Sequence, residues 1–165
     1  MGSTSRRRTA RAGDSAPKFE LARFGGGSAS LDELRSKGPV VLAFFKISCS
    51  TCQFTFPFLE RLHQGAGDGA PRLIAISQDD AEGTAEFHRE YGITMPTLLD
   101  EESKDYPASD AYGITHVPSM FLVEPSGEIS WSSVGFVKAE MEELGRRFGV
   151  APFRKDDYVP SSKAG

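Results

Sequence analysis

The fold is decided by residues 39–52, which read PVVLAFFKISCSTC. The first part, residues 39–47, is an apolar run rich in branched and aromatic residues, bounded by Gly38 and Ser48. Such a run is typical of a strand buried on both faces, as in a parallel sheet. A helix is predicted over residues 50–63, so Cys49 and Cys52 lie where a buried strand ends and a helix begins.

Working outward, the pattern of apolar runs, turn residues and helix stops predicts the other elements. We expect strands at residues 19–24, 73–76, 97–99, 117–123 and 128–134, the last two forming a hairpin. We expect further helices at residues 31–35, near 80–91, at 108–112 and at 137–148. Strands that alternate with helices indicate an α/β fold, a mixed sheet covered on both faces.

Local signals fix several of the helix ends. Ser30 and Glu33 form a capping-box pattern that opens the helix at 31–35. Pro57 lies inside the helix at 50–63, where proline costs about 3 kcal/mol. The helix either ends at Phe56 or continues with a kink, and the apolar face that continues beyond Pro57 favours the kink. Gly149 is predicted to end the last helix.

The length of 165 residues suits one domain with one core. Residues 1–17 are rich in Ser, Arg and Gly, and we predict a disordered basic tail there. The domain is expected over residues 18–149, and residues 150–165 are expected to be an extended C-terminal tail.

The charge is unevenly placed along the chain. Residues 1–18 carry a net charge of +4, and because the whole chain carries −4, the rest carries −8. An acidic body argues against nucleic acid as the main partner. No apolar run approaches a membrane span, and no apolar stretch follows Arg11 as a signal peptide requires. We therefore expect a cytoplasmic protein, or a periplasmic or exported one if a signal has been removed.

Cysteine occurs only twice, at Cys49 and Cys52. Two cysteines are too few for a disulfide scaffold, and a bridge across three residues closes too small a loop to add much stability. The pair is therefore better explained by reactivity than by structure.

A helix N-terminus offers unpaired N–H groups and a partial positive charge, which favour a thiolate. We expect Cys49 to be the exposed first-turn or cap residue and Cys52 to lie one turn inward. The spacing supports a two-step exchange in which Cys49 attacks a substrate disulfide and Cys52 then releases the substrate. The alternatives are half of a zinc site, which needs four ligands, a pair of inert buried cysteines, and a purely structural disulfide.

The sequence resembles the thioredoxin superfamily, in features that occur in the same order. These are the buried strand before the motif, the CxxC at Cys49 and Cys52, Pro57 five residues later, and the segment YGITHVPSMFLV at residues 112–123. The leading segment and the inserted αβ unit at residues 79–100 resemble the redoxin-type branch. That branch includes thiol–disulfide oxidoreductases and the alkyl-hydroperoxide-reductase/thiol-specific-antioxidant group.

The resemblance implies a thioredoxin-like fold with an N-terminal extension, and a role in cell redox homeostasis. It implies that Pro118 is cis beside the two sulfurs and that the Val117 backbone pairs with an extended substrate. A trans proline at a strand start is the alternative, and Pro96 is a rival position. We also expect Ser50 and Thr51, between the cysteines, to help position the substrate.

We expect no cofactor and no metal. The expected partners are a protein or small molecule that carries a disulfide or dithiol, and an unidentified electron donor. We expect a monomer with no membrane span.

Four positions depart from the pattern of many relatives. Ser48 stands where many have Trp before the first cysteine, and Ala43 stands where thioredoxins have a buried acid. Without that acid, Cys52 needs another base or water for its deprotonation. The central pair Ser50-Thr51 matches neither of the best-known types, so the redox potential does not follow from it.

Two other functions compete. Peroxidases of the peroxiredoxin type place Thr three residues and Pro seven residues before the reactive cysteine. For Cys49 these positions hold Lys46 and Leu42, and for Cys52 they hold Cys49 and Phe45, so neither cysteine fits. The other alternative is a metal-binding or metal-delivery module that uses Cys49, Cys52 and His116.

Overall fold

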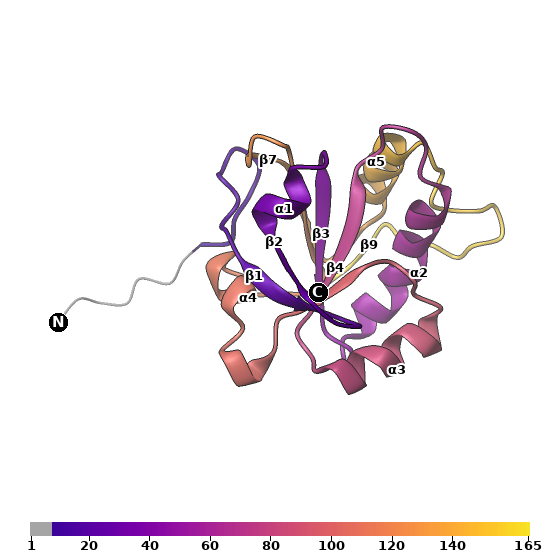
Figure 1. Ribbon diagram of the computed structural model, residues 1–165. Coiled ribbons are helices and arrows are strands. Elements are labelled where there is room, and N and C mark those ends of the chain that lie inside the picture. The colour runs from indigo at the N-terminus through magenta and orange to yellow at the C-terminus, as the bar shows by residue number, and fades with distance from the viewer. Residues whose placement is uncertain (1–7) are drawn as a thin grey trace.

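The computed structural model describes residues 8–165, which form a seven-stranded sheet with helices on both faces (Figure 1). The strands lie in the order β2-β1-β5-β4-β3-β6-β7. Their bounds are β1 Glu20–Arg23, β2 Ser28–Ser30, β3 Val40–Phe45, β4 Arg72–Ser77, β5 Thr97–Leu99, β6 Ser119–Val123 and β7 Ile129–Val134. A separate two-stranded ribbon joins β8 Phe136–Val137 to β9 Ser162–Lys163.

The helices are α1 Leu31–Arg35, α2 Ser50–Gly65, α3 Ala81–Tyr91, α4 Pro107–Ala111 and α5 Lys138–Phe148, with a 3-10 turn, η1, at Glu102–Lys104. Figure 1 shows α1 and α4 on one side of the sheet and α2, α3 and α5 on the other. The central pairs β3–β4 and β4–β5 are parallel, whereas β3–β6 and β6–β7 are antiparallel. The predicted mixed sheet, covered on both faces, is confirmed.

The helix-end signals act as the sequence predicts. The Ser30 hydroxyl accepts a hydrogen bond from the Glu33 amide at 3.1 Å, which completes the N-cap of α1. Helix α2 runs through Pro57 to Gly65, so the apolar face outweighs the cost of the interior proline. Gly149 ends α5 in the left-handed conformation.

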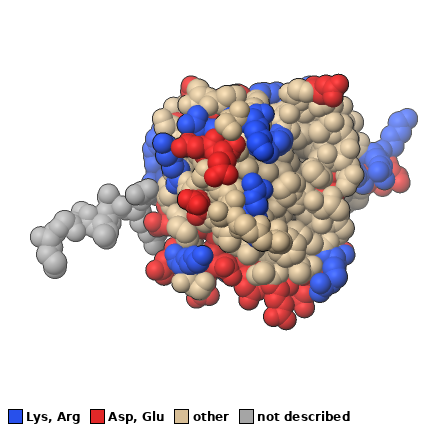
Figure 2. Space-filling view, viewed as in Figure 1, with Lys and Arg blue, Asp and Glu red and all other residues tan. Residues whose placement is uncertain are grey.

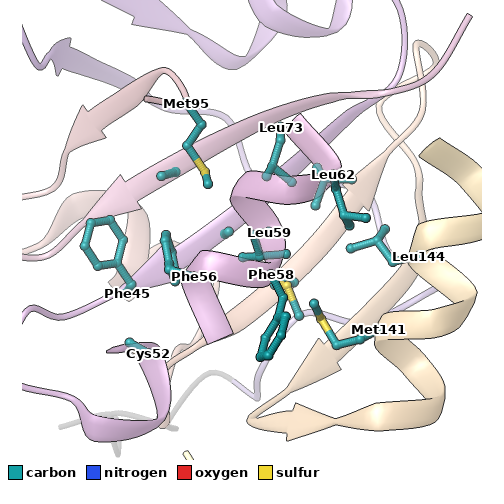
Figure 3. Packing of buried hydrophobic residues seen from close by; sticks show 14 of the residues in the cluster. Phe45, Cys52, Phe56, Phe58, Leu59, Leu62, Leu73, Met95, Met141 and Leu144 are labelled. Atoms are coloured by element: carbon teal, nitrogen blue, oxygen red, sulfur yellow. The ribbon is translucent and has the colours of Figure 1, made fainter. Parts of the chain in front are cut away.

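The core lies in two layers because β3 is buried on both faces. Val41, Ala43 and Phe45 point toward α2, and the alternate residues of the strand point toward α1 and α4. In the layer shown in Figure 3, Leu59 and Leu62 of α2 lie toward Met141 and Leu144 of α5, whereas Phe56 packs against Phe45 of β3, with ring centroids 4.4 Å apart. In the other layer Tyr112 is fully buried, and its ring centroid lies 5.2 Å from those of both Phe44 and Phe121.

The N-terminal segment, residues 8–17, follows the body of the molecule by backbone pairing. The Ala10 amide donates to Tyr112 O at 2.9 Å, and the Ile129 amide donates to Asp14 O at 2.9 Å. Gly113 has a positive φ of 64°, and a Cβ there would collide with the Arg8 carbonyl. The predicted disorder of residues 1–17 is therefore wrong for residues 8–17, because backbone hydrogen bonds need no apolar side chains; residues 1–7 lie outside the described residues. The domain boundaries at 18 and 149 stay predictions.

The described surface carries charges of both signs. In the view of Figure 2, acidic side chains gather along the edge formed by α3 and η1, beside a broad area without charge. This distribution agrees with the acidic body that the sequence predicts.

Candidate active site

Cys49 is the N-cap residue of α2, immediately beyond the loop that follows β3. Its extended backbone, with φ −82° and ψ 115°, turns the chain into the helix, and its sulfur accepts a hydrogen bond from the Cys52 amide at 3.1 Å. The Cys49 thiol donates to Val117 O at 3.3 Å and is partly exposed. The sulfur therefore receives one of the unpaired N–H groups of the helix start, as the sequence predicts.

Cys52 lies one turn further along α2 and is fully buried in the layer of Figure 3. Burial raises the pKa of its thiol, and hydrogen bonding to Cys49 and the nearby charge of Asp79 raise it further. Both cysteines are reduced in this structure. The two thiols are therefore unequal: one reaches solvent, and the other is shielded and holds its proton.

The segment before β6 approaches the pair from the neighbouring strand. The Val117–Pro118 peptide bond is cis, the isomer that the resemblance implies. Pro118 is buried and Val117 is half-buried. Because β6 runs antiparallel to β3, with Ser119 opposite Phe44, this loop reaches the same end of the sheet as the start of α2.

The two residues between the cysteines have different surroundings. Ser50 is exposed, whereas Thr51 is buried and its hydroxyl donates to Ala164 O at 2.6 Å. The structure thus brings Ser50, Thr51 and Val117 around Cys49, and adds Ala164, which the sequence analysis placed in an extended tail.

Asp79 is a site residue that was not predicted from the sequence. Its carboxylate accepts a hydrogen bond from the Ile47 amide at 2.8 Å, and the Gln53 side chain donates to Ile47 O at 2.9 Å, so both backbone groups of Ile47 are bound. These bonds hold the loop that leads to Cys49. The signal was available: Asp79 follows β4, and the ends of neighbouring parallel strands meet at one edge of a sheet.

The profile of the AhpC/TSA family matches residues 12–132. The chain belongs to the AhpC/TSA family. Within it, the chain is 33% identical to thiol-disulfide oxidoreductase ResA of Halalkalibacterium halodurans, over 83% of this chain and 76% of that protein. It is 28% identical to ResA of Bacillus subtilis, over 71% of this chain and 64% of that protein.

A solved structure shares the fold. The thioredoxin domain of a thiol-disulfide oxidoreductase from Bacteroides vulgatus superposes with a TM-score of 0.73 at 20% identity, over 85% of this chain and 99% of that domain. The ResA relatives and the family match show that this chain is a thiol–disulfide oxidoreductase of the thioredoxin type. The predicted superfamily, redoxin-type branch and enzyme class are confirmed.

Other candidate residues lie apart from the pair. His116 is exposed and its ring pairs with the Thr115 hydroxyl at 3.0 Å. Within residues 8–165, no three His, Cys, Asp or Glu side chains come together as a metal ion would need, so His116 does not complete a ligand set with Cys49 and Cys52. Over the same residues, no helix has the length and apolar character that crossing a membrane requires. Ala43 is fully buried on the α2 side of β3, so no acid stands there.

Proposed function

We propose that Cys49 is the attacking thiol and Cys52 the resolving thiol of disulfide exchange with a protein or small-molecule substrate. The observation that carries the proposal is the contact at the start of α2, where the Cys52 amide donates to the Cys49 sulfur at 3.1 Å. This bond stabilises negative charge on Cys49, and the same turn of helix holds Cys52 within reach of it.

The exchange proceeds in two balanced steps. The Cys49 thiolate attacks one sulfur of a substrate disulfide, forming a mixed disulfide and releasing the other sulfur as a thiolate. The Cys52 thiol then gives its proton to solvent and attacks the Cys49 sulfur, which releases the second substrate sulfur as a thiolate and leaves the enzyme with one disulfide. Solvent protonates the two substrate thiolates. A dithiol donor restores the reduced pair, and the same steps run backwards oxidise a substrate dithiol.

The surroundings assign a part to the neighbouring residues. In the thiol form, Cys49 donates a hydrogen bond to the Val117 carbonyl. A Cys49 thiolate has no proton to donate, so this carbonyl becomes free to accept a hydrogen bond from an amide of the substrate. We propose that Val117, Pro118, Ser50 and Thr51 position the substrate there. Because burial raises the pKa of Cys52, the resolving step should accelerate as pH rises.

The test is a pair of single variants incubated with an oxidised protein substrate. Cys52→Ser keeps the attacker without the resolver, so mixed disulfides should accumulate and be visible by intact-protein mass spectrometry. Cys49→Ser keeps only the shielded thiol and should trap little. Equal trapping by the two variants would refute these roles.

Hydrogen peroxide serves as the control oxidant in the same experiment. The family includes the peroxidase alternative, but the positions that peroxidases fill with Thr and Pro hold Lys46 and Leu42 before Cys49. We therefore expect peroxide to oxidise Cys49 more slowly than the substrate disulfide does. The midpoint potential of the pair decides whether the enzyme works as a reductant or an oxidant. The monomeric state stays a prediction from the sequence, and so does the location, which is cytoplasmic, or periplasmic or exported if a signal has been removed.

A further inference from the structure

The C-terminal segment, Ser161 to Gly165, lies across the start of α2. Its β9 residues pair in antiparallel register with β8: Lys163 faces Phe136, and Ser162 faces Val137. The Lys138 amide extends this ribbon by donating to Ser161 O at 2.9 Å. The segment is therefore seated as an added strand.

Beyond the ribbon, the segment reaches the groups that surround Cys49. The Thr51 hydroxyl donates to Ala164 O at 2.6 Å. Gly165 lies so close to Val117 that a Cβ added to it would stand 2.7 Å from Val117 O. Val117 O is also the acceptor of the Cys49 thiol, so segment and sulfur meet at one carbonyl.

Several residues that the segment crosses make close contacts with it. Gly135 has a positive φ of 73°, and a Cβ there would lie 2.9 Å from Lys163 O. The Lys163 ammonium stands 5.2 Å from the centre of the Phe54 ring. Upstream, Arg61 forms an ion pair with Asp157 at 2.7 Å, which fastens the chain before it turns toward the site.

The segment is nevertheless only weakly attached to the rest of the fold. The ribbon has two residues on each strand, and residues 161–165 are exposed to solvent. A two-stranded ribbon of this length is marginal on its own, and exposed backbone pairing opens at low cost. The segment can therefore leave its seat while the rest of the fold stays intact.

We propose that residues 161–165 occupy the position beside Cys49 that an extended polypeptide substrate would take, and so determine which disulfides reach Cys49. A protein disulfide needs room for a stretch of chain along Val117 and Thr51, so it must displace the segment. A small disulfide needs room only for its two sulfurs and short substituents. The proposal rests on the proposed role of Cys49 as the attacking thiol.

The test compares the full chain with a chain that ends at Pro160, using insulin as the protein disulfide and hydroxyethyl disulfide as the small one. The rate with a protein substrate scales with the fraction of molecules whose site is open. Removing the segment should therefore raise kcat/KM for insulin by about fivefold or more and change that for hydroxyethyl disulfide by less than about twofold. Equal values for the two chains, or a fall with insulin, would overturn the proposal.

Two further measurements keep the outcome interpretable. A peptide of residues 160–165 added in excess should inhibit the shortened chain with insulin, whereas a peptide of scrambled order should not. Exchange of the Lys138 amide should be faster in the shortened chain, and that of the Gly127 amide, bound to Glu124 O in a distant turn, should be unchanged. An unchanged Lys138 amide would show that the segment does not sit there. If neither chain exceeds the Cys49→Ser variant with either disulfide, the proposed function itself fails, which is a distinct result.

Discussion

The two faces of the sheet are both tightly packed, but different segments cross them. One face carries α2, α3 and α5, and the other carries α1 and α4. Side chains alternate along β3, so Phe45 is fully buried on one face and Phe44 on the other. The first face receives the start of α2, the two sulfurs and the C-terminal segment. The second is crossed by the N-terminal segment, residues 8–17, whose backbone bonds go to Tyr112, Gly127 and Ile129. Packing alone therefore does not distinguish the reactive face from the other. What distinguishes the reactive face is that a buried strand ends there and a long helix begins.

The largest expected effect tests whether the two core layers contribute equally to the stability of the fold. Phe56 and Phe121 are both fully buried, one on each face. Phe56→Ala and Phe121→Ala should each lower the free energy of unfolding by about 3–5 kcal/mol, as cavities of this size do. Urea unfolding of both variants measures the loss.

The same two variants should differ at the sulfurs. Phe56 lies one turn beyond Cys52 on α2 (Figure 3), so its removal should expose Cys52 to alkylation in the folded protein. Phe121→Ala serves as the matched control, with Cys52 still protected. Equal exposure in both variants would mean that the two faces are not independent.

A buried carboxylate on each face offers the next comparison. Glu60 of α2 accepts hydrogen bonds from the Thr94 and Met95 amides at 2.9 and 3.1 Å. Asp100, beyond β5, accepts bonds from the Ala108 and Ser109 amides at 2.9 and 2.7 Å and so holds the start of α4. Each carboxylate ties a loop to its own face.

Glu60→Gln and Asp100→Asn should each cost about 1–3 kcal/mol at neutral pH, because a charged acceptor of buried amides is lost. Burial opposes the charge of Glu60, but hydrogen bonds, those from Thr94 first, outweigh it and hold the pKa of Glu60 below its ordinary value of 4.5. A lowered pKa stabilises the fold above that value, and the gain is lost as pH falls through the folded-state pKa. The difference in the free energy of unfolding between the parent protein and Glu60→Gln, measured with urea, should therefore shrink on acidification. A gap that widens in acid would contradict this assignment.

The sequence predicted most of the first face, and the reasons are local. A long buried run, a cap position and a helix period fix β3, Cys49 and α2 without knowledge of the rest of the chain. The seat of the C-terminal segment could not be predicted in this way, because β8 and β9 have two residues each and show no period. The backbone pairing of residues 8–17 leaves no apolar signature either. Asp79 and Asp80 are the same residue type side by side in the sequence, yet Asp80 caps α3 and Asp79 holds Ile47.

The smallest expected effect compares the two terminal segments directly. The Thr9 hydroxyl donates to Gly113 O at 2.6 Å on the α4 side, as the Thr51 hydroxyl donates to Ala164 O on the other. Thr9→Val keeps the shape and removes the donor, so the free energy of unfolding should fall by about 1 kcal/mol. Exchange with insulin and with hydroxyethyl disulfide should stay at the parent rates, because the hydrogen bonds of residues 8–17 to the rest of the fold go to Tyr112, Gly113, Gly127 and Ile129, and not to Cys49 or Val117. The shortened chain that ends at Pro160 should behave in the opposite way: little change in urea unfolding, since residues 161–165 are exposed, and a faster reaction with insulin. If Thr9→Val altered the insulin rate as much as removal of residues 161–165 does, both segments would act through general loosening of the fold, and the distinction between a segment that closes a core and one that covers a site would fail.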